Sequence, residues 1–169
     1  PSELSAERIA AGGLRLSEPR VDRGAVYWLE GRPSEAGRTA LMRSARDGEI
    51  EECTPPAADA RSCVHEYGGG AYCVRDGRIF YVDHAARRLR ELGEAALGRS
   101  DARYADLELA PDGRWLVAVE ERVPAAAVDR ADAEPDNRIV ALAVAARGGS
   151  SEEAAGVFDE ADFVSTPRF

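Results

Sequence analysis

The 169-residue sequence predicts an all-β fold, because a theme of strand, glycine-containing turn and stronger strand recurs along it. The stronger strands begin after Gly24, Gly77 and Gly113, at intervals of 53 and 36 residues. These intervals bracket the ~40–50 residues of one propeller blade, which is a unit of four antiparallel strands. We therefore expect a partial β-propeller of about three to four blades, preceded by a short N-terminal helix.

The first unit is expected over about residues 14–56. Residues 5–12 precede it as a short helix, with a serine at the N-cap and a glycine just past the last turn. The strand at 25–29, Ala-Val-Tyr-Trp-Leu, is apolar on both faces, which is typical of a strand inside a stack of sheets. The Asp47-Gly48 pair then predicts a hairpin turn into a fourth strand.

Two further units follow, over about 64–100 and 103–158, and residues 163–169 are expected to start the next blade. Each unit has an Asp-Gly turn before its strong strand, at Asp76-Gly77 and at Asp112-Gly113. Turn chemistry alone explains both pairs, because Asp and Gly tolerate the left-handed backbone that such turns require. We therefore treat them as structural turns and not as metal ligands.

The segment 85–99 is ambiguous, because Leu89, Leu92 and Ala96 fall at helical spacing. A short helix there competes with the outer strand that a blade requires. Trp28 and Trp115 stand at matching places in two repeats, so both are predicted to be core residues. Residues 124–135 show no periodicity and predict a long exposed loop.

The composition excludes several classes of partner. With 22 basic and 31 acidic residues the net charge is −9, which argues against a nucleic acid or an anionic membrane. No run approaches the ~20 apolar residues of a membrane span, so we expect a cytoplasmic protein. Cys53, Cys63 and Cys73 lie ten residues apart, unlike the close cysteine pairs of metal sites, and predict free thiols. No metal and no cofactor are expected.

A stretch of three glycines, Gly68, Gly69 and Gly70, follows His65, Glu66 and Tyr67 and runs into an apolar strand. Glycine permits backbone angles and close approaches that a side chain forbids. A phosphate-binding loop would also need a Lys-Ser/Thr pair and a following helix, which are missing. The glycines therefore predict a tight turn or close packing between blades.

Several of these motifs, in this order, resemble the N-terminal propeller of the prolyl oligopeptidase family of serine peptidases. The most similar branch is that of bacterial dipeptidyl aminopeptidase and acylaminoacyl-peptidase-like enzymes. Each motif alone is modest, but together they extend over nearly the whole chain. The segments that carry the resemblance are 9–13, 16–21, 26–33, 64–72, 103–107, 111–114 and 165–169.

The resemblance implies a seven-bladed propeller that covers an α/β-hydrolase domain and admits short peptides to a Ser-His-Asp site. The hydrolase domain is missing from this chain. No Gly-x-Ser-x-Gly nucleophile elbow is present, since residues 148–152 lack the closing glycine. No catalytic residue can be assigned, and we expect this chain alone to hydrolyse nothing. Its open sheet edges make a homo-oligomer a further expectation.

The resemblance also suggests substrate-side residues. His65, Glu66 and Tyr67 are expected on the propeller face turned toward the missing catalytic domain; alternatively, His65 only braces the glycine loop. Glu120 and Glu121 resemble the paired glutamates with which dipeptidyl peptidases hold a substrate's α-amino group, a charge-assisted interaction. Because this pair ends a predicted strand before a loop, simple solvation of both carboxylates is the alternative.

Two other function classes stay open. The chain fits a non-catalytic propeller that binds protein partners. It also fits a metal-dependent propeller enzyme such as a lactonase, but that class needs several Glu, Asn and Asp side chains converging on a central channel, and the sequence shows no such set. The peptidase segment, with a short peptide as substrate and neither nucleic acid nor membrane as partner, is the leading interpretation.

Overall fold

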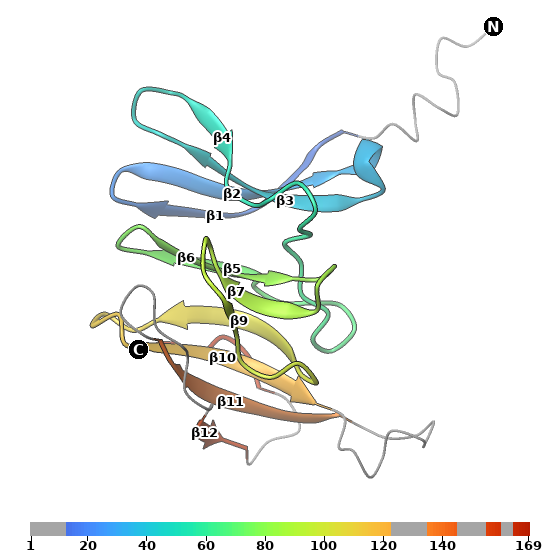
Figure 1. Ribbon diagram of the computed structural model, residues 1–169, viewed down its shortest axis with the longest axis vertical. Helices are drawn as coiled ribbons and strands as arrows, with labels where there is room; N and C mark the ends of the chain where they lie inside the picture. Colours follow the sequence, from blue (N-terminus) through green and yellow to red (C-terminus); the bar gives the residue numbers. More distant parts are fainter. Residues whose placement is uncertain (1–12, 123–134, 145–154, 160–163) are drawn as a thin grey trace, which may run out of the picture.

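The computed structural model describes residues 13–122, 135–144, 155–159 and 164–169. Within these residues the fold is all-β, with three four-stranded antiparallel sheets and one 3-10 turn, η1 (Pro33–Glu35). The sheets are stacked in chain order (Figure 1). The predicted all-β class is confirmed, whereas the predicted helix at 5–12 and nearly all of the predicted loop at 124–135 lie outside the described residues.

Each sheet is a meander whose strands pair in sequence order. Sheet A contains β1 (Arg15–Asp22), β2 (Ala25–Arg32), β3 (Arg38–Ser44) and β4 (Ile50–Glu52). Sheet B contains β5 (Tyr72–Arg75), β6 (Arg78–Asp83), β7 (Arg88–Glu91) and β8 (Ala96–Leu97). Sheet C contains β9 (Arg103–Leu109), β10 (Trp115–Arg122), β11 (Asp136–Ala143) and β12 (Ala155–Phe158).

The recurring glycines owe their positions to backbone conformation. Gly24, Gly77 and Gly113 have φ values of +78°, +74° and +70°. Residues with a Cβ rarely adopt these angles, so glycine is favoured at the turn before each second strand. The repeat read from the sequence therefore marks the same turn in all three sheets.

Two apolar layers hold the stack together, one on each face of sheet B. Strand β6 supplies both layers, because successive side chains point to opposite faces. Ile79 and Tyr81 pack against sheet A, while Phe80 and Val82 pack against sheet C. Burying a side chain of this size contributes about 1.5–3 kcal/mol. A strand that is apolar on both faces is thus sandwiched between sheets in the middle of the stack.

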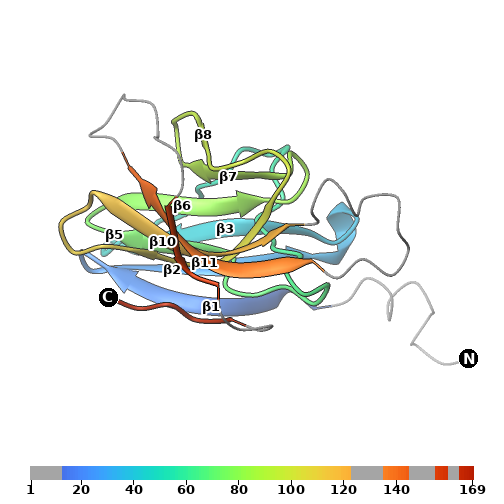
Figure 2. The ribbon, with the colours of Figure 1, turned by 90° about the horizontal axis from the view of Figure 1, so that it is seen from below.

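Neighbouring sheets approach one another most closely through their first strands, since β1 contacts β5 and β5 contacts β9. Figure 2 shows β1 at one margin of the molecule and β7 and β8 at the opposite margin. The C-terminal residues 164–169 run along the β1 margin (Figure 2) and form no strand in this described part of the chain. The first-strand edge is therefore the side on which the three sheets and the C-terminal segment meet.

The helical alternative for residues 85–99 is wrong. Leu89 lies in β7 and packs into the layer between sheets B and C, whereas Leu92 packs on the side of sheet A. Between β7 and β8 the chain turns at Gly93, where φ is +81°. The helical spacing thus arises from two strands and a turn.

The prediction that both tryptophans are core residues is also wrong. Trp115 begins β10 and is 40% exposed, because its side chain lies on the face of sheet C that points away from sheet B. Its neighbour Leu116 points the other way and is fully buried. Trp28 is only half-buried, on the outer face of sheet A.

Candidate functional site

The glycine loop leaves sheet A, lies against sheet C and only then enters sheet B. Gly70 exchanges two hydrogen bonds with Asp106 of β9: its N–H donates to the carboxylate at 2.6 Å, and the Asp106 N–H donates to its carbonyl at 2.7 Å. A Cβ at Gly69 would lie 2.9 Å from Cβ of Ala105, and one at Gly70 would lie 3.1 Å from Oδ1 of Asp106. These two positions are glycine because the loop touches the neighbouring sheet.

The turn just before these glycines is strained. His65 and Glu66 have φ values of +54° and +67°, and Gly68 follows at +89°. A left-handed backbone costs roughly 1–2 kcal/mol for a residue with a Cβ. The His65 N–H donates to Oε1 of Glu121 at 2.9 Å, and the Gly68 N–H donates to the carbonyl of Val64 at 2.9 Å. Glu121 of sheet C and Val64 of the turn itself thus hold this turn in an uncommon conformation, as is frequent at functional sites.

The three residues before the glycines differ in what they expose. Tyr67 is 79% exposed and Glu66 is exposed as well. The side chain of His65 is only 9% exposed, with Nδ1 lying 3.8 Å from Oε1 of Glu121. The ring centroids of His65 and Tyr67 are 6.0 Å apart. Glu66 and Tyr67 are therefore available to a ligand, while His65 is mainly an internal brace.

Glu120 and Glu121 are not solvated, in contrast to the alternative drawn from the sequence. Both lie near the end of β10, and their exposed fractions are 0% and 3%. As consecutive strand residues they point to opposite faces of sheet C. The structure therefore does not bring the two carboxylates together.

Each glutamate is neutralised by an arginine from a neighbouring strand. Glu120 accepts hydrogen bonds from Nε of Arg138 at 2.9 Å and from the hydroxyl of Tyr104 at 2.8 Å. Glu121 accepts one from Arg103 at 2.9 Å in addition to the His65 N–H. Burial raises the pKa of the Tyr104 phenol, so the hydroxyl stays protonated and donates. A buried charge left without its partner is costly, which makes these pairs structurally important.

Sequence reasoning missed a pair of acidic residues at the first-strand edge. Glu18 in β1 and Asp106 in β9 stand at bulges in their strands and have φ values of +51° and +53°. Oε2 of Glu18 accepts the N–H of Ala71 at 3.1 Å, and Oδ2 of Asp106 accepts the N–H of Thr166 at 2.9 Å. The available signal was weak: an acidic residue in the middle of each of these first strands, which carry other polar residues as well.

Burial raises the pKa of Glu18 above its ordinary value of 4.5, and the nearby charge of Asp106 adds to this shift. The hydrogen bond from Ala71 and the charge of Arg20 oppose it. Glu18 thus contributes a partly desolvated carboxylate to the same edge as the glycine loop.

The described residues offer no group of three or more His, Cys, Asp or Glu side chains placed to hold a metal ion. Within the same residues, no helix is long and apolar enough to cross a membrane.

Comparison with known proteins gave matches among solved structures only: no family model matches the chain, and no curated protein does. A puromycin-hydrolyzing peptidase of Mycobacterium tuberculosis is 32% identical, with a TM-score of 0.84 over 99% of this chain and 28% of that one. A puromycin hydrolase is 22% identical, with a TM-score of 0.75 over 95% of this chain and 27% of that one.

A mutant puromycin hydrolase complexed with PGG is 21% identical, with a TM-score of 0.78 and the same coverage of 95% and 27%. The two puromycin hydrolases are only 22% and 21% identical to this chain and show the shared fold alone. The peptidase of Mycobacterium tuberculosis shares the fold and is also 32% identical in sequence. The chain spans a little over a quarter of the length of these proteins. The resemblance to the prolyl oligopeptidase family of peptidases that was drawn from the sequence is thus confirmed, by the shared fold and by 32% identity over nearly all of this chain.

Proposed function

We propose that this chain is the N-terminal segment of the β-propeller of a serine peptidase, and that it gates access to a Ser-His-Asp site located beyond it. One observation carries the proposal: 99% of the chain aligns, at 32% identity, with 28% of the length of a puromycin-hydrolyzing peptidase. A match of the whole chain to about a quarter of an enzyme is what one segment of such an enzyme would give. The dipeptidyl aminopeptidase and acylaminoacyl-peptidase-like branch, in a bacterial cytoplasm, is the narrower form of this proposal.

The arrangement of the sheets supports a propeller. Each sheet is a four-stranded meander, and neighbouring sheets contact each other mainly through their first strands, as blades do around a central channel. We assign sheets A, B and C to blades over 14–56, 64–100 and 103–158. Residues 163–169 then lead into the next blade.

The exposed residues of the strained turn are the proposed contact with substrate. Glu66 and Tyr67 point into solvent, while His65 and Glu121 fix the backbone that presents them. The ligand is a short peptide or a similar amide, and neither nucleic acid nor membrane is a partner. Glu120 is assigned an internal role, because Arg138 and Tyr104 engage its carboxylate.

The test is hydrolysis of puromycin by the product of the complete gene. Puromycin has an aminoacyl amide bond, and the proposal predicts cleavage of this bond and of aminoacyl anilides. Tyr67→Ala is expected to raise KM several-fold while kcat stays within about twofold, the pattern of a lost binding contact. Glu49→Gln, at an exposed turn of sheet A, is the matched control. A product that cleaves no amide would refute the proposal and favour the protein-interaction propeller.

A further inference from the structure

A cavity of about 450 Å³ lies beside the glycine loop, and its wall holds a thiol and an imidazole in contact. Sγ of Cys63 is 3.2 Å from Nδ1 of His84. Cys63 precedes the strained turn, and His84 follows directly after β6, so a loop and a strand end fix the pair from both sides. Cys63 is half-buried and lines the cavity, and a small reagent therefore has access to its sulfur.

The cavity has a cationic rim. Four arginines and three acidic residues line it. Two of these acids already have arginine partners, since Asp83 pairs with Arg90 at 3.3 Å and Asp101 with Arg99 at 2.9 Å. Among the lining arginines, Arg61 forms an ion pair with Asp59, and Arg103 forms an ion pair with Glu121.

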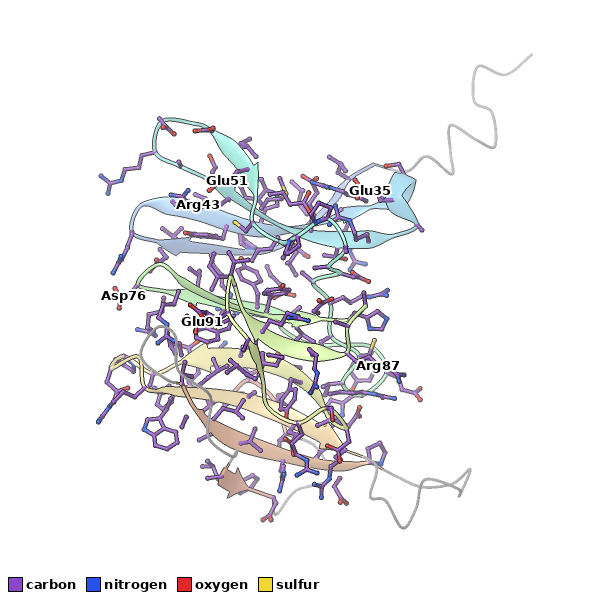
Figure 3. All side chains as sticks on the ribbon, viewed as in Figure 1. Glu35, Arg43, Glu51, Asp76, Arg87 and Glu91 are labelled. Atoms are coloured by element: carbon purple, nitrogen blue, oxygen red, sulfur yellow. The ribbon has the colours of Figure 1, made fainter. Side chains whose placement is uncertain are left out.

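The other two lining arginines, Arg87 and Arg88, have no ion pair within the described part of the chain. Arg87 lies at the right-hand edge of the stack (Figure 3). Glu66 is the remaining acid of the rim and is exposed. The unpaired positive charge of the rim therefore favours an anionic ligand.

Cys53 provides a comparison within the same molecule. It lines a second cavity, of about 480 Å³ and thus of similar size, but no histidine lines that cavity. Acids predominate there, with Asp22, Glu51 and Glu52 against two arginines. Burial, together with the charge of Glu51, raises the pKa of Cys53 to about 11. Its thiol therefore stays protonated at neutral pH.

Cys73 is the third thiol and is packed between sheets B and C, with an exposed fraction of 2%. Burial raises its pKa to about 12. Since the thiolate is the reactive form of cysteine, neither Cys53 nor Cys73 is suited to react. Only Cys63, of the three, combines access, a base and nearby cations.

We propose that Cys63 and His84 form a reactive-thiol site that takes small anionic disulfides and becomes a mixed disulfide. His84 accepts the proton of the Cys63 thiol, and the sulfur then attacks one sulfur of the bound disulfide. The S–S bond of the reagent breaks as the new S–S bond forms. The departing thiolate takes up the proton and leaves as a free thiol, so Cys63 is oxidised and the reagent reduced. Arginines of the rim hold the carboxylates of the reagent.

The test exposes the intact protein to glutathione disulfide, an anionic disulfide, and maps the adduct by peptide mass spectrometry. Cleavage after arginine places Cys53 in peptide 47–61, while Cys63 and Cys73 share peptide 62–75 and are separated by fragmentation. We expect Cys63 to react at least about tenfold faster than Cys53 and Cys73. Equal or faster reaction of Cys53 would overturn the proposal.

Two variants test the contributions of the imidazole and of the arginine rim separately. His84→Asn is expected to slow alkylation of Cys63 by iodoacetamide about tenfold, because the base is lost. Arg87→Gln with Arg88→Gln should slow the anionic reagent iodoacetate more than neutral iodoacetamide, whereas Arg23→Gln at the other cavity should change neither rate. Continued protection of Cys73 shows that each variant is folded. An unchanged rate in folded His84→Asn would contradict the role of the imidazole.

Discussion

The joint between sheets A and B and the joint between sheets B and C occupy equivalent places in the stack but use different groups. At the first joint, Glu18 accepts one backbone N–H from Ala71, and the hydroxyl of Tyr72 donates to the Glu18 carbonyl at 2.6 Å. At the second, the carboxylate of Asp106 accepts two N–H groups, from Gly70 at 2.6 Å and from Thr166 at 2.9 Å. Asp106 thus connects three segments of chain, whereas Glu18 connects two.

The turns that follow the first strands of sheets B and C are each bound by a charged side chain of the preceding sheet, but the two side chains have opposite charges. In sheet A, the carboxylate of Asp22 accepts the N–H groups of Asp76 and Gly77 at 2.9 and 2.8 Å. Between sheets B and C, Arg78 instead donates to the carbonyl of Gly113 at 2.7 Å, while Glu91 holds its guanidinium. Equivalent turns of the repeat therefore keep a hydrogen bond to the next sheet, although the side chain that makes it differs in charge and in its place in the repeat. What the repeat preserves is the backbone path.

The largest effect is expected from adding a methyl group at the second joint. Gly69→Ala places a Cβ 2.9 Å from that of Ala105, and Ala105 cannot move without shifting β9. Overpacking of this kind costs typically about 1–3 kcal/mol. Gly13→Ala is the control, because a Cβ there meets nothing within 4 Å. Urea unfolding should show a large loss for Gly69→Ala and a change within about 0.5 kcal/mol for the control; equal midpoints would show that the close contact is unimportant.

The second-largest effect is expected from substitutions of the two carboxylates, Asp106 and Glu18. Asp106→Asn places an amide group where two N–H donors converge, and we expect a loss of about 2 kcal/mol in the free energy of unfolding. Glu18 accepts only one N–H group, so Glu18→Gln should lower the free energy of unfolding by about 1 kcal/mol or less. Denaturant titrations of both variants at neutral pH measure the difference. A greater loss for Glu18→Gln would reverse the ranking of the joints.

A pH series sharpens the same comparison. Because burial raises the pKa of Glu18, the folded protein binds its proton more tightly than the unfolded chain does. Stability contributed by this group therefore falls as pH rises from the ordinary value of 4.5 through the raised value in the folded state. The stability of the unsubstituted protein relative to Glu18→Gln should decline across this window. A relative stability that rises with pH would indicate that the carboxylate is better solvated than its burial implies.

The smallest effects are expected at the turns. Asp22→Asn should cost about 0.5–1 kcal/mol, since Asp22 is partly exposed and its two N–H partners lie in an exposed turn. Arg23→Gln breaks an ion pair whose side chains are 65% and 68% exposed, and exposed pairs contribute little. We expect a change below about 0.5 kcal/mol for Arg23→Gln. Thermal unfolding of both variants beside the unsubstituted protein checks this order.

The sequence was sufficient for the features set by local backbone geometry. The Asp76-Gly77 and Asp112-Gly113 turns lie where Asp-Gly pairs predicted them, because their left-handed backbone is a local requirement. The family resemblance was likewise visible, since the segments that carry it, such as 64–72 and 111–114, are contiguous stretches of residues.

Features that depend on distant partners were beyond the sequence. The sequence suggested either a substrate-binding pair or a solvated strand end for Glu120 and Glu121, because nothing nearby in the chain shows that Arg138 and Arg103 neutralise them. Cys63 and His84 are 21 residues apart, and only the path from sheet A to sheet B brings them into contact. The bulges at Glu18 and Asp106 were missed for the same reason, since the residues they contact, Ala71 and Gly70, lie far away in the sequence.

Labelling of the complete gene product with a serine-reactive fluorophosphonate tests most directly whether this chain is a non-catalytic segment of a serine peptidase. The label is identified by peptide mass spectrometry, and loss of puromycin hydrolysis is followed in parallel. The account predicts one labelled serine per molecule, located outside residues 1–169, and loss of hydrolysis in proportion to labelling. Stoichiometric labelling of a serine within residues 1–169, or hydrolysis that continues in fully labelled protein, would contradict it.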